Sequence, residues 1–247
     1  MVRRASQQRT RRTRCVLRQR AIAGAAATLL SLAGLSVQAL PFYVVSGSVN
    51  SDPTNFFPID VNAAVQDFLG STLNVGNGAA GSFSALAGAQ LSLAGLAVAN
   101  GGGNGTVVFD GAQVYVGGTG NRLTMGNSAS TGSLEVRAGA LLDATVNAND
   151  CTAPGAFCNN FIGHAAGSNV TLAINGAGSE VRTLRSFVLG GAAVHGAGFG
   201  LPGGTTQAAL NITAGGTLRT DGGQISAGPG GSTPTGNEHT FSSVVID

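Results

Sequence analysis

One phrase of residues recurs about six times after residue 70, and it limits the possible folds more than any other feature of this chain. Each copy has an apolar pair ending in glycine, a Gly/Ser turn, a second apolar pair, a Gly-Ala turn and a third apolar pair. Self-similarity of this kind, built on two-residue alternation, is typical of a repeat array. The copies begin in steps of 23, 27, 37, 27 and 38 residues, at Leu73, Leu96, Leu123, Asn160, Phe187 and Ile225.

Three short strands and three turns fit into one step, so we expect each copy to form one coil of a parallel β-solenoid. Six or seven such coils, each about 4.8 Å high, would form a rod about 30 Å long. The competing architecture is a β-sandwich, but its strands would not share one phrase. Stacked coils should bring the following residues into one internal ladder: Val75, Val98, Met125, Ile162 and Leu189.

Alternation inside each copy predicts which side chains point inward. Leu134 and Val136 are apolar and enclose Glu135, so the first two should be buried and Glu135 should face solvent. The composition favours many short stacked strands and disfavours a core built from bulky side chains. Trp is absent, aromatic residues make up 5% of the chain, and Gly contributes 40 of its 247 residues.

The first 39 residues have the character of a secretory signal peptide. Eight of the 13 basic residues lie in the first 20 positions, followed by the apolar run 21–37 and the small-residue site Val37-Gln-Ala39. We expect cleavage after Ala39. Without the first 39 residues the chain has five basic and 11 acidic residues, a net charge of about −6. This negative charge argues against nucleic-acid binding.

Other readings of the N-terminus stay open. An uncleaved anchor would need about 20 apolar residues, and this run is shorter and rich in Ala and Gly. Arg11-Arg12 suggests a twin-arginine signal, although Arg14 stands where that motif has an apolar residue. A lipoprotein is disfavoured because Cys15 precedes the apolar run.

Cys151 and Cys158 lie in a polar insert between two copies. In an exported protein such a pair is most simply a disulfide, so we expect a Cys151–Cys158 bond. Free thiols are the alternative. A metal site would require four ligands, and only His164 is nearby in sequence.

Residues 40–71 lack the phrase and are rich in aromatic side chains. We expect them to cap the open edge of the array at residues 72–247, with a short helix beginning at Asp60. A binding surface built from the same aromatics is the alternative.

At the other end, Val244-Val-Ile246-Asp247 aligns with Val107-Val-Phe109-Asp110 and stops one residue before its Gly. We therefore expect the natural chain to continue past Asp247.

The phrases Thr131-Gly-Ser-Leu-Glu-Val-Arg-Ala-Gly-Ala-Leu-Leu and Gln207-Ala-Ala-Leu-Asn-Ile-Thr-Ala-Gly-Gly-Thr-Leu resemble passenger repeats of bacterial autotransporters. They are also similar to repeats of secreted proteins with a Pro-Glu-Pro (PEP-CTERM) sorting tail. The resemblance covers about residues 72–247. It implies a right-handed parallel β-helix at the surface of a Gram-negative bacterium, and it implies no particular activity.

The sequence offers no clear catalytic, cofactor or metal site. Glycosidic hydrolysis usually uses two nearby carboxylates, but the acids of the array are scattered singly and should be solvated. Only Asp110 and Glu135 could approach across adjacent coils. His164, His195 and His239 are far apart, and 196–200 and 102–107 only mimic nucleotide and calcium loops, the latter with Val107 replacing the carboxylate. The acids considered are Asp110, Glu135, Asp143, Glu180 and Asp221.

These observations predict a monomeric, exported structural or adhesin-like protein with no catalytic activity and no cofactor. Its partners would be an extracellular matrix polysaccharide or a host or cell surface. Loops such as the two inserts would make the contact. It would meet a membrane only through a C-terminal anchor or barrel. The alternatives are a carbohydrate-active β-helix enzyme (lyase or glycosidase) and a passive stalk of a larger autotransporter.

Overall fold

The computed structural model describes residues 40–52, 59–120, 122–147, 160–165, 167–184, 187–190, 205–221, 225–227 and 239–247. In these ranges the chain is all-β with no helical residue, and most strand pairs are parallel, as expected for a β-helix repeat array. The same ranges hold no helix long and apolar enough for a membrane crossing. The expected signal peptide, Cys151 and Cys158 lie outside the described residues.

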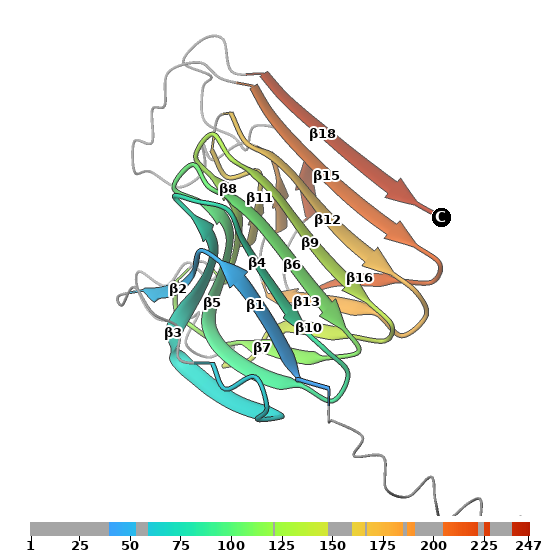
Figure 1. Cartoon of the computed structure of the whole chain (residues 1–247). Helices are drawn as coiled ribbons and strands as arrows, with labels where there is room; N and C mark the ends of the chain where they lie inside the picture. The colour runs from blue at the N-terminus through green and yellow to red at the C-terminus, as the bar shows by residue number, and fades with distance from the viewer. Residues whose placement is uncertain are drawn as a thin grey trace, which may run out of the picture. The chain divides into compact units, whose positions relative to one another are not determined.

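Sheet A contains β1, which precedes the repeats, and then one strand from each successive copy of the phrase, in the order β1-β4-β6-β9-β12-β15-β18 (Figure 1). β1 is antiparallel to β4, and all other neighbours are parallel. The strands are β1 (Tyr43–Gly47), β4 (Gly81–Ala85), β6 (Asn104–Asp110), β9 (Thr131–Arg137), β12 (Asn169–Asn175), β15 (Thr205–Thr213) and β18 (His239–Ile246).

Sheet B has 11 strands and contains two stacks, because β3 (Val65–Asn77) and β5 (Gln90–Asn100) are long enough to contribute to both. The β10 stack contains residues 65–68 and 90–93 of these strands, then β7 (Gln113–Val116), β10 (Leu141–Ala144), β13 (Glu180–Leu184) and β16 (Thr217–Asp221). The β8 stack contains residues 72–77 and 96–100, then β8 (Leu123–Asn127), β11 (Asn160–Ile162), β14 (Phe187–Leu189) and β17 (Ile225–Ala227), with β2 (Val49–Asp52) antiparallel to β3.

The register of the β8 stack confirms the alignment of the repeated phrase. The six residues expected to begin the copies are paired in sequence, from Leu73 with Leu96 through to Phe187 with Ile225. Two positions later the expected internal ladder is present and buried: Val75, Val98, Met125, Ile162 and Leu189. The strands of this stack keep their register although the chain between them differs in length from copy to copy.

A left-handed backbone residue follows each of the five ladder residues. Gly76 has a φ of 75°, and a Cβ atom there would lie 2.3 Å from the carbonyl oxygen of Asn104. Both the positive φ and the close approach favour glycine. The equivalent residues, all with positive φ, are Ala99, Gly126, Gly163 and Gly190.

The core lies between the sheets, and strand β9 shows the predicted alternation. Leu134 and Val136 are fully buried, whereas the side chain of Glu135 is 30% exposed. Above and below Val136 in the register are Phe109 and Ile174, so the buried row is apolar in successive copies. The predicted register of this strand is confirmed.

The segment before the repeats contains strands and a turn, so the expected helix at Asp60 is wrong. The Asp60 carboxylate accepts a hydrogen bond from the amide of Asn62 (2.9 Å), and the Ala63 amide donates to the carbonyl of Asp60 (3.1 Å). The buried Gln66 side chain bonds the backbone of Asp60 in both directions. Val65 then begins β3 because its neighbour β5 offers a strand edge.

β1, β2 and residues 65–68 of β3 pair with the three strands of the first copy of the phrase. Tyr43 is buried, 6.1 Å from the ring of Phe83, and its hydroxyl donates to the carbonyl of Gln90 (2.8 Å). This aromatic side chain therefore belongs to the core. Phe56 and Phe57 lie outside the described residues.

Candidate functional site: a polar strip and a corner cavity

The outward side of the β10 stack carries an ordered row of polar side chains, which we call the polar strip. Tyr115, Asp143, Arg182 and Arg219 occupy the same position in successive strands and are direct register partners. Each is the third residue of a short strand, so the alternation that buries its neighbours turns it outward. The strip is completed by residues beside this row: Gln113, Thr145, Glu180 and Asp221.

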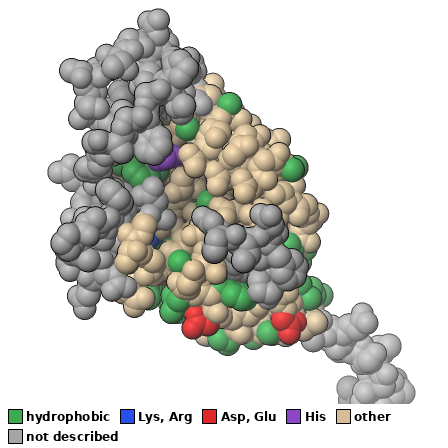
Figure 2. Space-filling model, turned by 90° about the vertical axis from the view of Figure 1, so that its left-hand side faces the viewer, with side chains coloured by type: hydrophobic (Ala, Val, Ile, Leu, Met, Phe, Trp, Pro, Cys, Tyr) green, Lys and Arg blue, Asp and Glu red, His purple; other side chains and the backbone are tan. Residues whose placement is uncertain are grey.

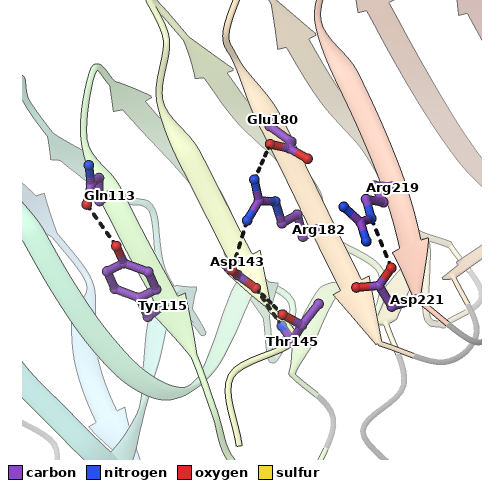
Figure 3. A network of polar contacts seen from close by, with 8 residues as sticks. All are labelled: Gln113, Tyr115, Asp143, Thr145, Glu180, Arg182, Arg219 and Asp221. Carbon is purple, nitrogen blue, oxygen red and sulfur yellow. Dashed lines mark hydrogen bonds and ion pairs between the residues drawn. The ribbon is translucent and has the colours of Figure 1, made fainter. Parts of the chain in front are cut away.

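Hydrogen bonds and ion pairs connect the strip within and between strands (Figure 3). Arg182 lies 2.8 Å from a carboxylate oxygen of Glu180 and 3.7 Å from one of Asp143. Arg219 lies 2.9 Å from Asp221. At the other end the Tyr115 hydroxyl donates to the side-chain oxygen of Gln113 (2.8 Å). The side chains of the strip are therefore held in place by one another.

Asp143 departs from the expectation that the acids are solvated. It is 9% exposed, and its carboxylate accepts hydrogen bonds from the amide (2.8 Å) and hydroxyl (2.6 Å) of Thr145. The expectation failed because the register places Arg182 next to Asp143, and Thr145 supplies two further hydrogen-bond donors to its carboxylate.

The Glu180 carboxylate stays ionised to lower pH than an ordinary glutamate. The hydrogen bond from Arg182 is the largest cause of its lowered pKa, and partial burial opposes the effect. The same hydrogen bond raises the pKa of Arg182. A carboxyl group that is ionised at neutral pH cannot donate a proton there, so Glu180 suits binding better than general acid catalysis.

This ion pair gives a testable dependence of stability on pH. An acid whose folded pKa is lowered stabilises the protein above its unfolded pKa, and the contribution disappears as pH falls through the folded pKa. We expect Glu180→Gln to reduce the loss of melting temperature as the pH falls from 4.5, the ordinary glutamate pKa, through the lower pKa of Glu180 in the folded protein. Thermal unfolding of both proteins at several pH values is the measurement. Parallel curves over this window would refute the assignment.

A cavity of about 380 Å³ lies at the corner where the β10 and β8 stacks meet. Its wall includes residues 69–70, Thr72, Ala94, the loop 117–120 and Asn147, so one leucine, small side chains, hydroxyls, an amide and backbone line it. Gly117 follows Tyr115 by two residues, which places this wall next to the polar strip. A Cβ atom on Gly118 would lie 2.4 Å from the carbonyl oxygen of Ala94, so this approach of two copies requires glycine.

Arg122 holds the backbone around this cavity. It is fully buried, and its guanidinium group donates to carbonyls on both sides of the corner, among them Gly118 (3.0 Å), Ala144 (2.7 Å) and Asn147 (3.2 Å). It also donates to Val116 and Val146. The planar guanidinium group has five N–H donors, which suits a ring of carbonyl oxygens. The cavity wall is therefore fixed by a buried cation.

Sheet A carries a second charged group away from the strip. Arg137 lies 2.9 Å from a carboxylate oxygen of Asp110 and 3.1 Å from one of Glu135. The acids are therefore not singly scattered, because arginines join them into groups across copies. Asp110 and Glu135, which the sequence suggested could approach across adjacent coils, both contact Arg137. The three side chains are 30–44% exposed.

The other candidate residues form no comparable site among the described ones. On the side of the molecule shown in Figure 2 the described surface is mostly uncharged, with acidic side chains at few points. His164 has its Nδ1 atom 3.2 Å from the side-chain oxygen of Asn127, and burial lowers its pKa. Within the described ranges no three His, Cys, Asp or Glu side chains are grouped as metal ligands. His195 lies outside these ranges, and His239 is in β18.

Sequence reasoning missed the strip and the cavity, although a signal was present. In the third strand of successive copies one residue follows an apolar side chain at an equivalent position, so the phrase alignment alone would have placed these residues in a row: Tyr115, Asp143, Arg182 and Arg219. Arg122 had no such signal, since an arginine beside a Gly-rich loop ordinarily suggests a solvated side chain.

Comparisons of the chain with protein-family models, with curated proteins and with solved structures found no match. The resemblance to autotransporter passenger repeats therefore remains a prediction from the quoted phrases.

Proposed function

We propose that this protein is an exported, non-catalytic scaffold of the bacterial cell surface or extracellular space. In this proposal the array is a right-handed parallel β-helix of about six to seven coils, and its outward rows make contact with other molecules. The observation that carries the proposal is the polar strip, where side chains from successive copies lie in one row and are fixed by hydrogen bonds and ion pairs. Fixed polar groups in a row suit recognition of an extended partner.

The proposed location depends on removal of the signal peptide. Leu40, the first residue after the expected site, is 82% exposed. We expect the protein recovered from the envelope or medium of a Gram-negative host to begin at Leu40, and protease added to intact cells to degrade it. Intact-mass measurement and the protease test check both points. Retention of residues 1–39 in protein recovered from the cytoplasm would contradict the proposal.

A carbohydrate-active enzyme is the second candidate, favoured by one observation. Asp143, Glu180 and Asp221 lie on the same face of the β10 stack, and carboxylates gathered on one face are what glycoside chemistry uses. Each of them contacts an arginine, and for Glu180 the hydrogen bond from Arg182 lowers the pKa and so favours the ionised form. Release of reducing ends or of unsaturated products from polysaccharides would support the enzyme over the scaffold.

A further inference from the structure

We propose that the polar strip and the corner cavity together bind a neutral polysaccharide, with one sugar unit in the cavity and the chain extending along the strip. The inference rests on the proposed function, because it assumes a protein that meets extracellular polymers. Four features of the described residues support it: the charge of the strip, its repeat spacing, the placement of Tyr115 and the construction of the cavity.

The charge of the strip disfavours an anionic partner. It combines three carboxylates with two guanidinium groups, and all five are in ion pairs with one another. Its net charge is therefore slightly negative and its strongest charges are already neutralised. Such groups still offer N–H donors and carboxylate acceptors, which are the partners that hydroxyl groups require. A neutral, hydroxyl-rich ligand fits this surface better than a polyanion.

The spacing of the strip suits a polymer. Successive strands place equivalent side chains about 4.8 Å apart, so Tyr115, Asp143, Arg182 and Arg219 cover about 14 Å in one line. A polymer with a repeating unit can contact such a row at several points. Once the first unit is bound, each further contact is intramolecular and adds to the affinity.

Tyr115 provides an aromatic surface beside the cavity. The hydrogen bond from its hydroxyl to Gln113 fixes the ring at one end, and the strand alternation places the ring outward. An aromatic ring combines a flat apolar face with a polar tip, so it can contact the C–H face of a sugar while neighbouring groups bind hydroxyls.

The cavity is partly open to solvent, and its volume is that of a small binding site. Its volume of about 380 Å³ lies in the range of small-molecule sites, roughly 300–1,000 Å³. Its wall offers the hydroxyl of Thr72, the amide of Asn147 and backbone groups of the loop 117–120. Because the buried Arg122 fixes this wall through carbonyls of two copies, little order has to be gained on binding.

Filling the cavity tests the inference most sharply. Ala94 lies in the cavity wall, and Ala173 is a similarly half-buried, outward-facing alanine on sheet A. Binding of the full chain to the neutral polymers dextran, laminarin and galactomannan and to the acidic polymer polygalacturonate is measured by calorimetric titration. We expect at least one neutral polymer to bind, with affinity lowered about tenfold or more by Ala94→Phe and by less than about twofold by Ala173→Phe.

A second pair of variants keeps the test decisive if Ala94→Phe does not fold. Tyr115→Ala removes the ring and should weaken binding about tenfold, whereas Tyr115→Phe keeps the ring and should weaken it less. Absence of binding to all three neutral polymers, tighter binding of polygalacturonate, or equal losses from Ala94→Phe and Ala173→Phe would overturn the inference.

The experiment distinguishes failure of this inference from failure of the proposed function. A protein that is exported but does not bind neutral polymers contradicts this inference and leaves the surface scaffold standing. A protein that stays in the cytoplasm contradicts the proposed function, and binding by the purified chain is still measured.

Discussion

Arg122→Met is expected to lower the free energy of unfolding by about 3–5 kcal/mol, because it leaves several buried carbonyl oxygens without their hydrogen-bond donor. The guanidinium group of Arg122 contacts five backbone carbonyl oxygens and is fully buried. Methionine fills similar space but donates no hydrogen bond, so these carbonyls would lose their donor away from water. Unpaired buried acceptors each cost about 1–3 kcal/mol, although local relaxation reduces the sum. Chemical denaturation of both proteins measures the effect.

Arg219→Met is the matched control for this variant. The Arg219 side chain is 60% exposed and pairs with Asp221 at the surface, so its removal should change stability by no more than about 1 kcal/mol. Equal losses from the two substitutions would show that Arg122 does not hold the corner. A similar melting temperature for Arg122→Met and the original protein would contradict the account of the cavity wall.

Val136→Asp is expected to destabilise the array by about 4 kcal/mol or more, because it buries an unpaired carboxylate. Val136 is fully buried between Phe109 and Ile174 of the adjacent copies, where no described polar side chain could pair with it. Thermal and chemical unfolding would show the loss, and the repeat array should lose order first around β9.

The neighbouring Glu135→Gln serves as the control on the same strand. Its side chain faces outward and pairs with Arg137 at the surface, so its substitution should cost no more than about 0.5 kcal/mol. If both changes had equal effects, the inward and outward rows would be assigned to the wrong faces, since a shift of one residue exchanges them.

The strand ladders were predictable because local and long-range patterns agree. Leu73, Leu96 and Leu123 begin equivalent strands in the sequence and are register partners in the structure. Alternation decides which residues face inward, and positive-φ residues such as Gly76 fix the turns. Where each copy repeats the same choices, one alignment determines the register of the whole stack.

The predictions failed where a contact between distant residues outweighs the local pattern. Asp60 begins a sequence typical of a capped helix, but Val65 pairs with β5 and begins strand β3 instead. Asp143 was expected in solvent, and nothing in the sequence marked Arg122 for burial, because charged side chains are rarely buried unless paired. Their partners come from other copies, Arg182 in one case and a ring of carbonyls in the other.

The central claim is that successive copies stack one strand spacing apart, and spin-label distances test it most directly. The register of sheet A places Thr171 three strands and Ser243 five strands away from Ser82, all facing outward. In a variant whose native cysteines are replaced by serine, Ser82→Cys is combined with Thr171→Cys or Ser243→Cys. The account predicts mean separations of about 14 Å and about 24 Å, a difference of two strand spacings. A Ser243 label as close to residue 82 as the Thr171 label, or closer, would mean that the copies fold back on one another and would contradict the stacked array.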